Sequence, residues 1–108
     1  MSLSAVMGIS LSGMQTQQTR AAATANNIAN AMTPRYDRLD TYFSSEEAGG
    51  VWASVSPSGA ATSDEGSNID LAQEAVSLIE SEIGFKANAS VWETGADMWD
   101  VLMSIKRD

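Results

Sequence analysis

The chain has no cysteine and no histidine among its 108 residues. Their absence excludes disulfide bonds, thiolate nucleophiles, imidazole bases and the common zinc sites. Adjacent acidic pairs occur at Glu46-Glu47 and Asp64-Glu65, but neighbouring positions in turn-rich sequence do not converge on one substrate or one calcium ion. We therefore expect no catalytic activity, no cofactor and no metal site.

Acidic residues are missing from the first third of the chain. Residues 1–36 contain Arg20 and Arg35 and no carboxylate, so this stretch carries a charge of +2 and the remainder −10, for a total of −8. The acidic total, with a pI near 4.2, argues against binding to nucleic acid phosphates. The two ends of the chain are complementary in charge.

Long apolar runs are also absent. No stretch approaches the ~18 apolar residues of a transmembrane helix, so we expect no membrane insertion. The N-terminus lacks the basic and apolar regions of a cleaved secretion signal. We expect a protein that stays in the cytoplasm or leaves it by a route without a cleaved signal.

The first periodic segment predicts a helix over residues 3–32. Its apolar or alanine positions, with one glutamine, follow an alternating spacing of four and three, which is typical of a heptad seam. The helix should end at Thr33, because the residue before Pro34 is driven from the α region. The seam residues are Met7, Leu11, Met14, Gln18, Ala21, Ala25, Ile28 and Met32.

The second periodic segment predicts a longer helix over residues 69–106, beginning after Ser67 or Asp70. It has the same four-three spacing with a wider apolar band. Trp92 and Trp99 lie seven residues apart on the seam and are predicted to be packing anchors, or, on a polymer subunit, to face a neighbouring copy. The seam residues are Leu71, Ala75, Leu78, Glu82, Phe85, Ala89, Trp92, Ala96, Trp99 and Met103, flanked by Val76, Ile79, Ile83, Val91, Met98, Leu102 and Ile105.

Turn-forming residues fill the segment between the helices. Residues 36–44 and 50–55 flank a glycine turn and predict a short β-hairpin, and residues 60–66 read as a linker. A parallel return would have to span ~45 Å again, so an antiparallel pair is favoured. We predict one mainly α domain of two long antiparallel helices: 1–34 and 67–108 as the helical core, and 35–66 as a variable hairpin.

Three asparagines, Asn26, Asn27 and Asn30, lie near the end of the first helix. Asparagine competes with helical hydrogen bonding, so these residues either cap a frayed end or bond to a neighbouring helix. Apart from Arg20, this helix is also uncharged outside its seam. That composition fits a low-complexity surface helix and an assembly surface about equally. The assembly surface is possible because an uncharged face can be packed against another chain without burying unpaired charges.

The run ANNIANAMTPRY at residues 25–36 resembles the N-terminal signature ANNIANxxTPGY of the bacterial flagellar axial proteins, which build the rod and hook. Residues 68–80 and 85–89, with the apolar residues that follow, are similar to that family's C-terminal motif. Two motifs in the right order are more specific than either alone. Arg35 replaces the signature glycine, which predicts either a type I turn or local strain.

The resemblance implies a structural subunit whose terminal helices pair in the inner layer of a tubular polymer. It implies the basal-body rod rather than the hook, export without cleavage through the flagellar type III apparatus, and assembly across the periplasm. Its partners would be further copies, other axial proteins and the export apparatus. The short middle segment leaves no room for an outer domain.

Two other classes stay open from the residues alone: a small secreted helical-hairpin protein, and a cytoplasmic coiled-coil adaptor or export chaperone. Trp92-Glu93-Thr94-Gly95 matches the Trp-x-Gly turn of the secreted class poorly, because it is one residue too long and lies within a helix. The residues that we expect in the helix seam and in assembly contacts are Met7, Leu11, Met14, Ala25, Asn26, Asn27, Ile28, Asn30, Leu71, Leu78, Ile79, Ile83, Phe85, Asn88, Trp92, Trp99 and Leu102.

Overall fold

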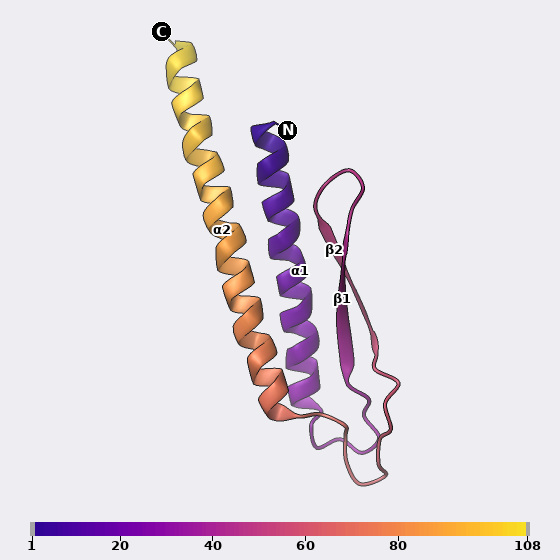
Figure 1. Cartoon of the computed structure of the whole chain (residues 1–108). Coiled ribbons are helices and arrows are strands. Elements are labelled where there is room, and N and C mark those ends of the chain that lie inside the picture. The colour runs from indigo at the N-terminus through magenta and orange to yellow at the C-terminus, as the bar shows by residue number, and fades with distance from the viewer. Residues whose placement is uncertain (1, 108) are drawn as a thin grey trace.

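The computed structural model describes the backbone of residues 2–107 and the side chains of residues 2–105. Two long helices run antiparallel, so that the two ends of the chain lie at the same end of the molecule (Figure 1). The molecule is a rod of 70 × 25 × 14 Å. The predicted fold class is confirmed: two helices with a small two-stranded sheet between them in sequence.

Helix α1 spans Leu3–Ala29. Ser2 caps its start, because the serine hydroxyl accepts a hydrogen bond from the backbone N–H of Ala5 at 3.1 Å. The helix ends three residues earlier than predicted. The Asn30 side chain donates to the carbonyl oxygen of Asn26 at 2.9 Å, and the following residues form tight turns toward Pro34.

Helix α2 spans Leu71–Arg107. Of the two predicted caps, Asp70 is the one used: its carboxylate accepts hydrogen bonds from the N–H groups of Ala72 at 3.0 Å and Gln73 at 3.3 Å. Ser67 instead donates to the carbonyl of Ala31, which ties the chain entering α2 to the segment leaving α1.

The connection forms the predicted hairpin, shifted by one to three residues. Strands β1 (Leu39–Ser45) and β2 (Val51–Pro57) pair antiparallel, and Gly49 and Gly50 both have positive φ in the turn. The hairpin packs against α1, which is therefore the middle layer between hairpin and α2 (Figure 1). The Ser12 hydroxyl accepts a bond from the Val51 N–H at 3.1 Å.

The single chain has almost no apolar core. Among the described side chains, Ala23 is the one hydrophobic residue that is buried. The other buried residues of both helices are polar or glycine: Ser10, Gly13, Thr16, Thr24, Asn27, Glu74, Ser81 and Gly95. Within residues 2–107, no helix is long and apolar enough to cross a membrane.

Candidate functional site

Asn27 is the centre of a polar cluster that joins the two helices and the first strand. Its exposed fraction is 1%. Its amide nitrogen donates to the Leu39 carbonyl at 3.0 Å and to Glu74 Oε2 at 3.3 Å. Its amide oxygen accepts from the Leu39 N–H at 2.9 Å and the Tyr36 hydroxyl at 3.0 Å. One amide thus holds α1, β1 and α2 together.

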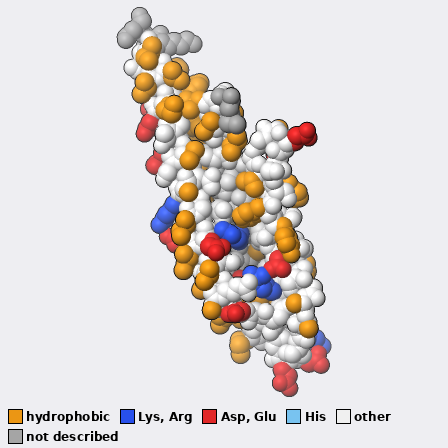
Figure 2. Space-filling view, viewed as in Figure 1, with side chains coloured by type: hydrophobic (Ala, Val, Ile, Leu, Met, Phe, Trp, Pro, Cys, Tyr) orange, Lys and Arg blue, Asp and Glu red, His pale blue; other side chains and the backbone are white. Residues whose placement is uncertain are grey.

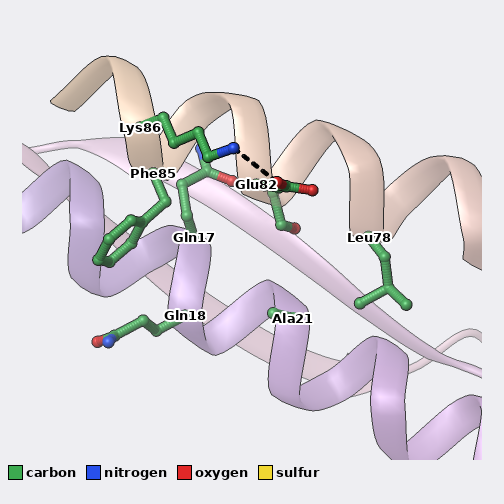
Figure 3. A pocket seen from close by; sticks show the side chains of 8 residues that line it. Gln17, Gln18, Ala21, Leu78, Glu82, Phe85 and Lys86 are labelled. Atoms are coloured by element: carbon green, nitrogen blue, oxygen red, sulfur yellow. Dashed lines mark hydrogen bonds and ion pairs between the residues drawn. The ribbon is translucent and has the colours of Figure 1, made fainter. Parts of the chain in front are cut away.

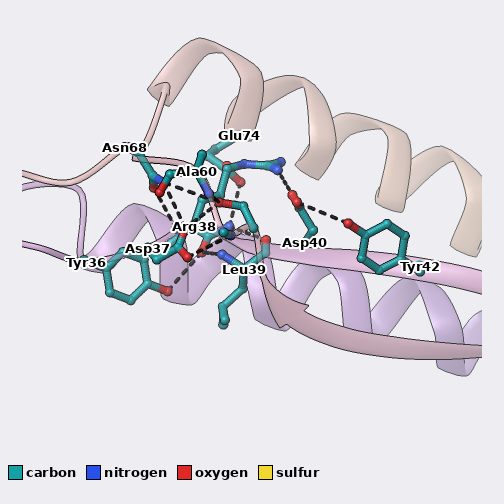
Figure 4. Close-up of polar contacts among 12 residues, drawn as sticks. Tyr36, Asp37, Arg38, Leu39, Asp40, Tyr42, Ala60, Asn68 and Glu74 are labelled. Atoms are coloured by element: carbon teal, nitrogen blue, oxygen red, sulfur yellow. Dashed lines mark hydrogen bonds and ion pairs between the residues drawn. The ribbon is translucent and has the colours of Figure 1, made fainter. Parts of the chain in front are cut away.

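A buried ion pair completes this cluster. The Glu74 side chain is fully buried and accepts a hydrogen bond from the Arg38 guanidinium, which also pairs with Asp40 (Figure 4). A buried carboxylate is tolerated only with such partners. No buried side-chain nitrogen or oxygen among the described residues lacks a hydrogen-bond partner.

A second polar cluster closes the base of the hairpin. Asn68 accepts from the Arg38 N–H at 2.7 Å and donates to Asp37 Oδ1 at 2.9 Å, as Figure 4 shows. Asp37 also accepts bonds from the Ser58 hydroxyl and the Gly59 N–H. The bonds from Ser58, Asn68 and Gly59 hold the pKa of the Asp37 carboxyl below its usual value. The connection from α1 to β1 and the connection from β2 to α2 are thus held together at the base of the hairpin.

Tyr36 covers the asparagine pair from outside. Its hydroxyl lies 3.0 Å from the amide nitrogen of Asn26 and from the amide oxygen of Asn27. Burial raises the pKa of the Tyr36 hydroxyl, with smaller contributions from the negative charges of Glu74 and Asp37. The phenol therefore remains a neutral donor at physiological pH.

Arg20, the one charge on α1, bridges the helix pair and the hairpin. Its Nε donates to the Ser81 hydroxyl on α2 at 2.9 Å, and a terminal nitrogen lies 3.5 Å from Glu80. Its guanidinium carbon is 5.1 Å from the ring centroid of Phe43 on β1, within the range of a cation–π contact. Its position in the chain gives no indication of these roles.

The helices meet mainly through small and polar residues, and of the predicted apolar seams Met7 also reaches the contact. A Cβ atom added to Gly13 would lie 2.3 Å from Oδ1 of Asn88, and one added to Gly84 would lie 2.6 Å from the amide nitrogen of Gln17. At Gly95, the same atom would lie 2.6 Å from the Met7 side chain. Glycine at these positions allows close approach of the helices. The contact stripes lie one residue before the apolar seams on both helices.

The expected assembly residues fall into three groups. Asn27 is buried, and Asn88 and Met7 lie at the helix contact. Met14, Asn30 and Phe85 are half-buried. The exposed residues are Leu11, Ala25, Asn26, Ile28, Leu71, Leu78, Ile79, Ile83, Trp92, Trp99 and Leu102. Their contacts in an assembly stay a prediction.

The two apolar seams border one groove along the helix pair. A hollow of about 250 Å³ lies between Gln18 and Ala21 of α1 and Leu78 and Phe85 of α2 (Figure 3). Farther along, Met14 faces Ala89 across a second hollow. Apolar side chains are also prominent along the outer side of α2 in Figure 2. This groove and outer side are the candidate assembly surfaces.

Sequence reasoning missed Arg38, Glu74 and Arg20. The pair formed by Arg38 and Glu74 joins residues 36 positions apart, and no spacing rule connects them. A weak signal existed for Glu74, which lies one residue before the seam position Ala75 on the stripe that turns out to face α1. Arg20 stood out only as a lone charge.

Comparison with known proteins decides the family. Residues 7–36 match the family model described as flagella basal body rod protein, and residues 60–105 match the model of the flagellar basal body rod FlgEFG protein C-terminal region. Together they cover about seven tenths of the chain. The chain belongs to the family of flagellar axial proteins that includes rod and hook proteins.

Two relatives are flagellar hook proteins FlgE. The protein from Rhizobium meliloti (strain 1021) is 42% identical and that from Brucella suis biovar 1 (strain 1330) is 44% identical, each over 43 residues. The aligned part is 40% of this chain and 11% of each relative. This axial protein thus aligns with only about a tenth of the length of those hook proteins. The first model includes the ANNIAN segment, and Asn27 within it carries the buried cluster.

Proposed function

We propose that this axial protein is a structural subunit of the flagellar basal-body rod and that it self-assembles through its two long helices. Its partners are further copies and other axial proteins, and it is exported through the flagellar export apparatus without cleavage. Residues 1–34 and 67–108 act as the rod core, and residues 35–66 as a variable excursion. Family membership supports the axial role, and the shape of the chain supports assembly.

The observation that carries the proposal is the near absence of a core in one chain. The accessible surface is 7111 Å², whereas a compact monomer of this mass exposes roughly 5,800 Å². The surplus of about 1,300 Å² exceeds the ~800 Å² that each partner buries in a standard interface. Ala23 is the one buried hydrophobic residue among the described side chains, so we infer that neighbouring subunits cover the others.

The rod is favoured over the hook for two reasons. Both matching family models have descriptions that name rod proteins. The segment between α1 and α2 forms one small hairpin with its connections, which leaves no separate outer domain. Mass spectrometry of purified basal bodies and of detached hooks tests this placement.

Enrichment of the protein in the detached hooks would place the subunit in the hook instead of the rod. A trimmed N-terminus typical of signal-peptidase cleavage would overturn the export route.

Self-assembly is tested by sedimentation and circular dichroism across a hundredfold dilution. Helicity and thermal stability should rise with concentration, because association stabilises the folded state by mass action. Ile79→Asp or Ile83→Asp should weaken association by at least about tenfold, since a carboxylate buried without a partner costs several kcal/mol. Both side chains are exposed in the single chain, so these variants should remain folded.

Ala87→Asp is the matched control, since Ala87 is an exposed, smaller residue of the same helix. It adds the same charge, and its loss of helix propensity is larger, because alanine is the best helix former. A folded monomer at every concentration would contradict the polymer function and favour the adaptor class. Equal weakening by Ala87→Asp and Ile79→Asp would show that general charge, rather than the apolar contact, controls association.

A further inference from the structure

Among the residues that the structure describes, no other helix lies beside the end of α2. Met7 and Leu3 of α1 contact α2 at Gly95, and α1 begins at its Ser2 cap. Residues 99–105 of α2 therefore project past α1, as the upper end of Figure 1 shows. We name residues 99–105 the overhang. A further hollow lies beside its base, bordered by Met98, Val101 and Leu102.

The overhang is apolar around most of its circumference. Its large side chains are Trp99, Val101, Leu102, Met103 and Ile105, and all five are exposed. A solvated helix normally keeps a polar face, and a helix that is hydrophobic on all sides is normally buried. Asp100 and Ser104 form its one polar side, so the rest of the overhang has the composition of a helix surface that other helices cover.

The groove offers the complementary surface at the other end of the molecule. Ala21 and Leu78 line the part of the groove that Figure 3 shows. Ile28 and Leu71 continue the two seams toward the segments that connect the helices to the hairpin. Seams spaced four and three apart accept the side chains of a third helix, as in coiled-coil packing. The groove is free in one chain because α1 and α2 contact each other through the neighbouring stripes.

Charge favours the α1 wall of the groove as the place where the overhang rests. Asp100 is the one charged residue within residues 99–105, so pairing two overhangs side by side would bring two carboxylates together. Helix α1 has no carboxylate. On the opposite wall, Glu82 is already paired with Lys86 at 2.7 Å, and this pair lowers the pKa of the Glu82 carboxyl.

We propose that the groove between α1 and α2 binds the overhang of a second copy of this chain. This inference rests on the proposed function and specifies its contact. The overhang and the groove are different surfaces of one chain, so each copy would present a free groove or overhang to the next. Such heterologous contacts build rings or open filaments rather than a two-fold dimer.

Cysteine cross-linking tests the contact, because the natural chain contains no cysteine. One batch carries Ala21→Cys in the groove and another carries Val101→Cys in the overhang, and the two are mixed under mild oxidation. Chains joined through positions 21 and 101 should accumulate. The control batch carries Gln15→Cys, on an exposed part of α1 outside the hollows that border the groove. Its cross-linking to Val101→Cys should be at least about tenfold slower.

A second variant tests the same contact without a cross-link of its own. Leu78 is partly exposed on the groove wall, so Leu78→Asp should leave the single chain folded. It should reduce the cross-link between positions 21 and 101 at least about tenfold. An unchanged cross-link with Leu78→Asp would overturn the groove as the binding surface.

Other outcomes separate this inference from the proposed function. If the chains associate in sedimentation but positions 21 and 101 do not cross-link, the groove contact is overturned and the structural function stands. Faster cross-linking between two Val101→Cys chains would show that overhangs pair with each other, which also overturns the groove contact and leaves the structural function standing. If the protein remains a monomer at every concentration, both the contact and the proposed function are overturned.

Discussion

Replacing Asn27 with alanine tests whether the buried cluster holds the fold together. Four hydrogen bonds would be lost: two with the backbone of Leu39, one with Glu74 and one with Tyr36. The neighbouring substitution Asn26→Ala is the matched control. Asn26 is exposed: its amide nitrogen donates to the Tyr36 hydroxyl at 3.0 Å, and its amide oxygen accepts from the Asn30 side chain at 3.3 Å.

The magnitude follows from these contacts. A net hydrogen bond contributes about 0.5–1.5 kcal/mol, and more when one partner is charged. Because Leu39 is only half-buried, water can restore part of its bonding in the variant. We therefore expect Asn27→Ala to lower the free energy of unfolding by about 2–4 kcal/mol and Asn26→Ala by less than about 1 kcal/mol. Both changes raise helix propensity alike, so that gain cancels in the comparison.

Urea unfolding followed by circular dichroism, at one fixed protein concentration, gives both free energies. The concentration must match because association contributes to apparent stability. Sedimentation of each variant beside the parent protein checks that the association state is the same. If the two substitutions cost the same, or if Asn27→Ala falls within ~0.5 kcal/mol of the parent protein, the cluster is not the element that joins the helices to the hairpin.

Three further substitutions probe the helix contact, the turn and the hairpin base. Gly13→Ala should lower the free energy of unfolding in urea by about 1–3 kcal/mol, because the added Cβ would meet the Asn88 amide. In the control Gly8→Ala, the added Cβ meets nothing within 4 Å, so this variant should raise the free energy of unfolding by up to ~1 kcal/mol. Arg35 has φ 63°, so Arg35→Gly should relieve strain and raise the thermal midpoint by several degrees, about 1 kcal/mol. Because the folded-state pKa of Asp37 lies below 3.8, the ionised carboxyl stabilises the fold above pH 3.8, and this stability is lost as the pH falls through the folded-state pKa. Asp37→Asn should remove that part of the acid unfolding transition, which circular dichroism follows.

An unchanged midpoint in Arg35→Gly would show that the positive φ is not strained. The sequence predicts a type I turn or local strain at Arg35, and its positive φ of 63° excludes the type I turn. The Arg35 N–H bonds to the carbonyl oxygens of Ser63 and Gly66 at 3.0 Å, which holds the turn in the left-handed region. Ser63 and Gly66, within the segment 60–66 that composition predicts as a linker, thus hold the turn at Arg35 that follows α1.

Local sequence determined the helices and the hairpin. The four-three spacing of apolar residues predicts both helices, Pro34 limits the first, and Asp70 starts the second through its cap. Glycines at 49 and 50 mark the hairpin turn. These features depend on nearest neighbours along the chain, so a single sequence carries them. The family motifs are equally local, which is why the resemblance was visible without coordinates.

The tertiary structure decided which stripe of each helix faces the other. Each helix carries an apolar stripe and, one residue earlier, a stripe of small and polar residues, and hydrophobicity alone favours the apolar one. The small stripe is used because Gly13 and Gly84 bring the helices close, and because Asn27 and Glu74 find partners there. Those partners are distant in sequence, so their complementarity exists only after folding, and it leaves the apolar stripes exposed.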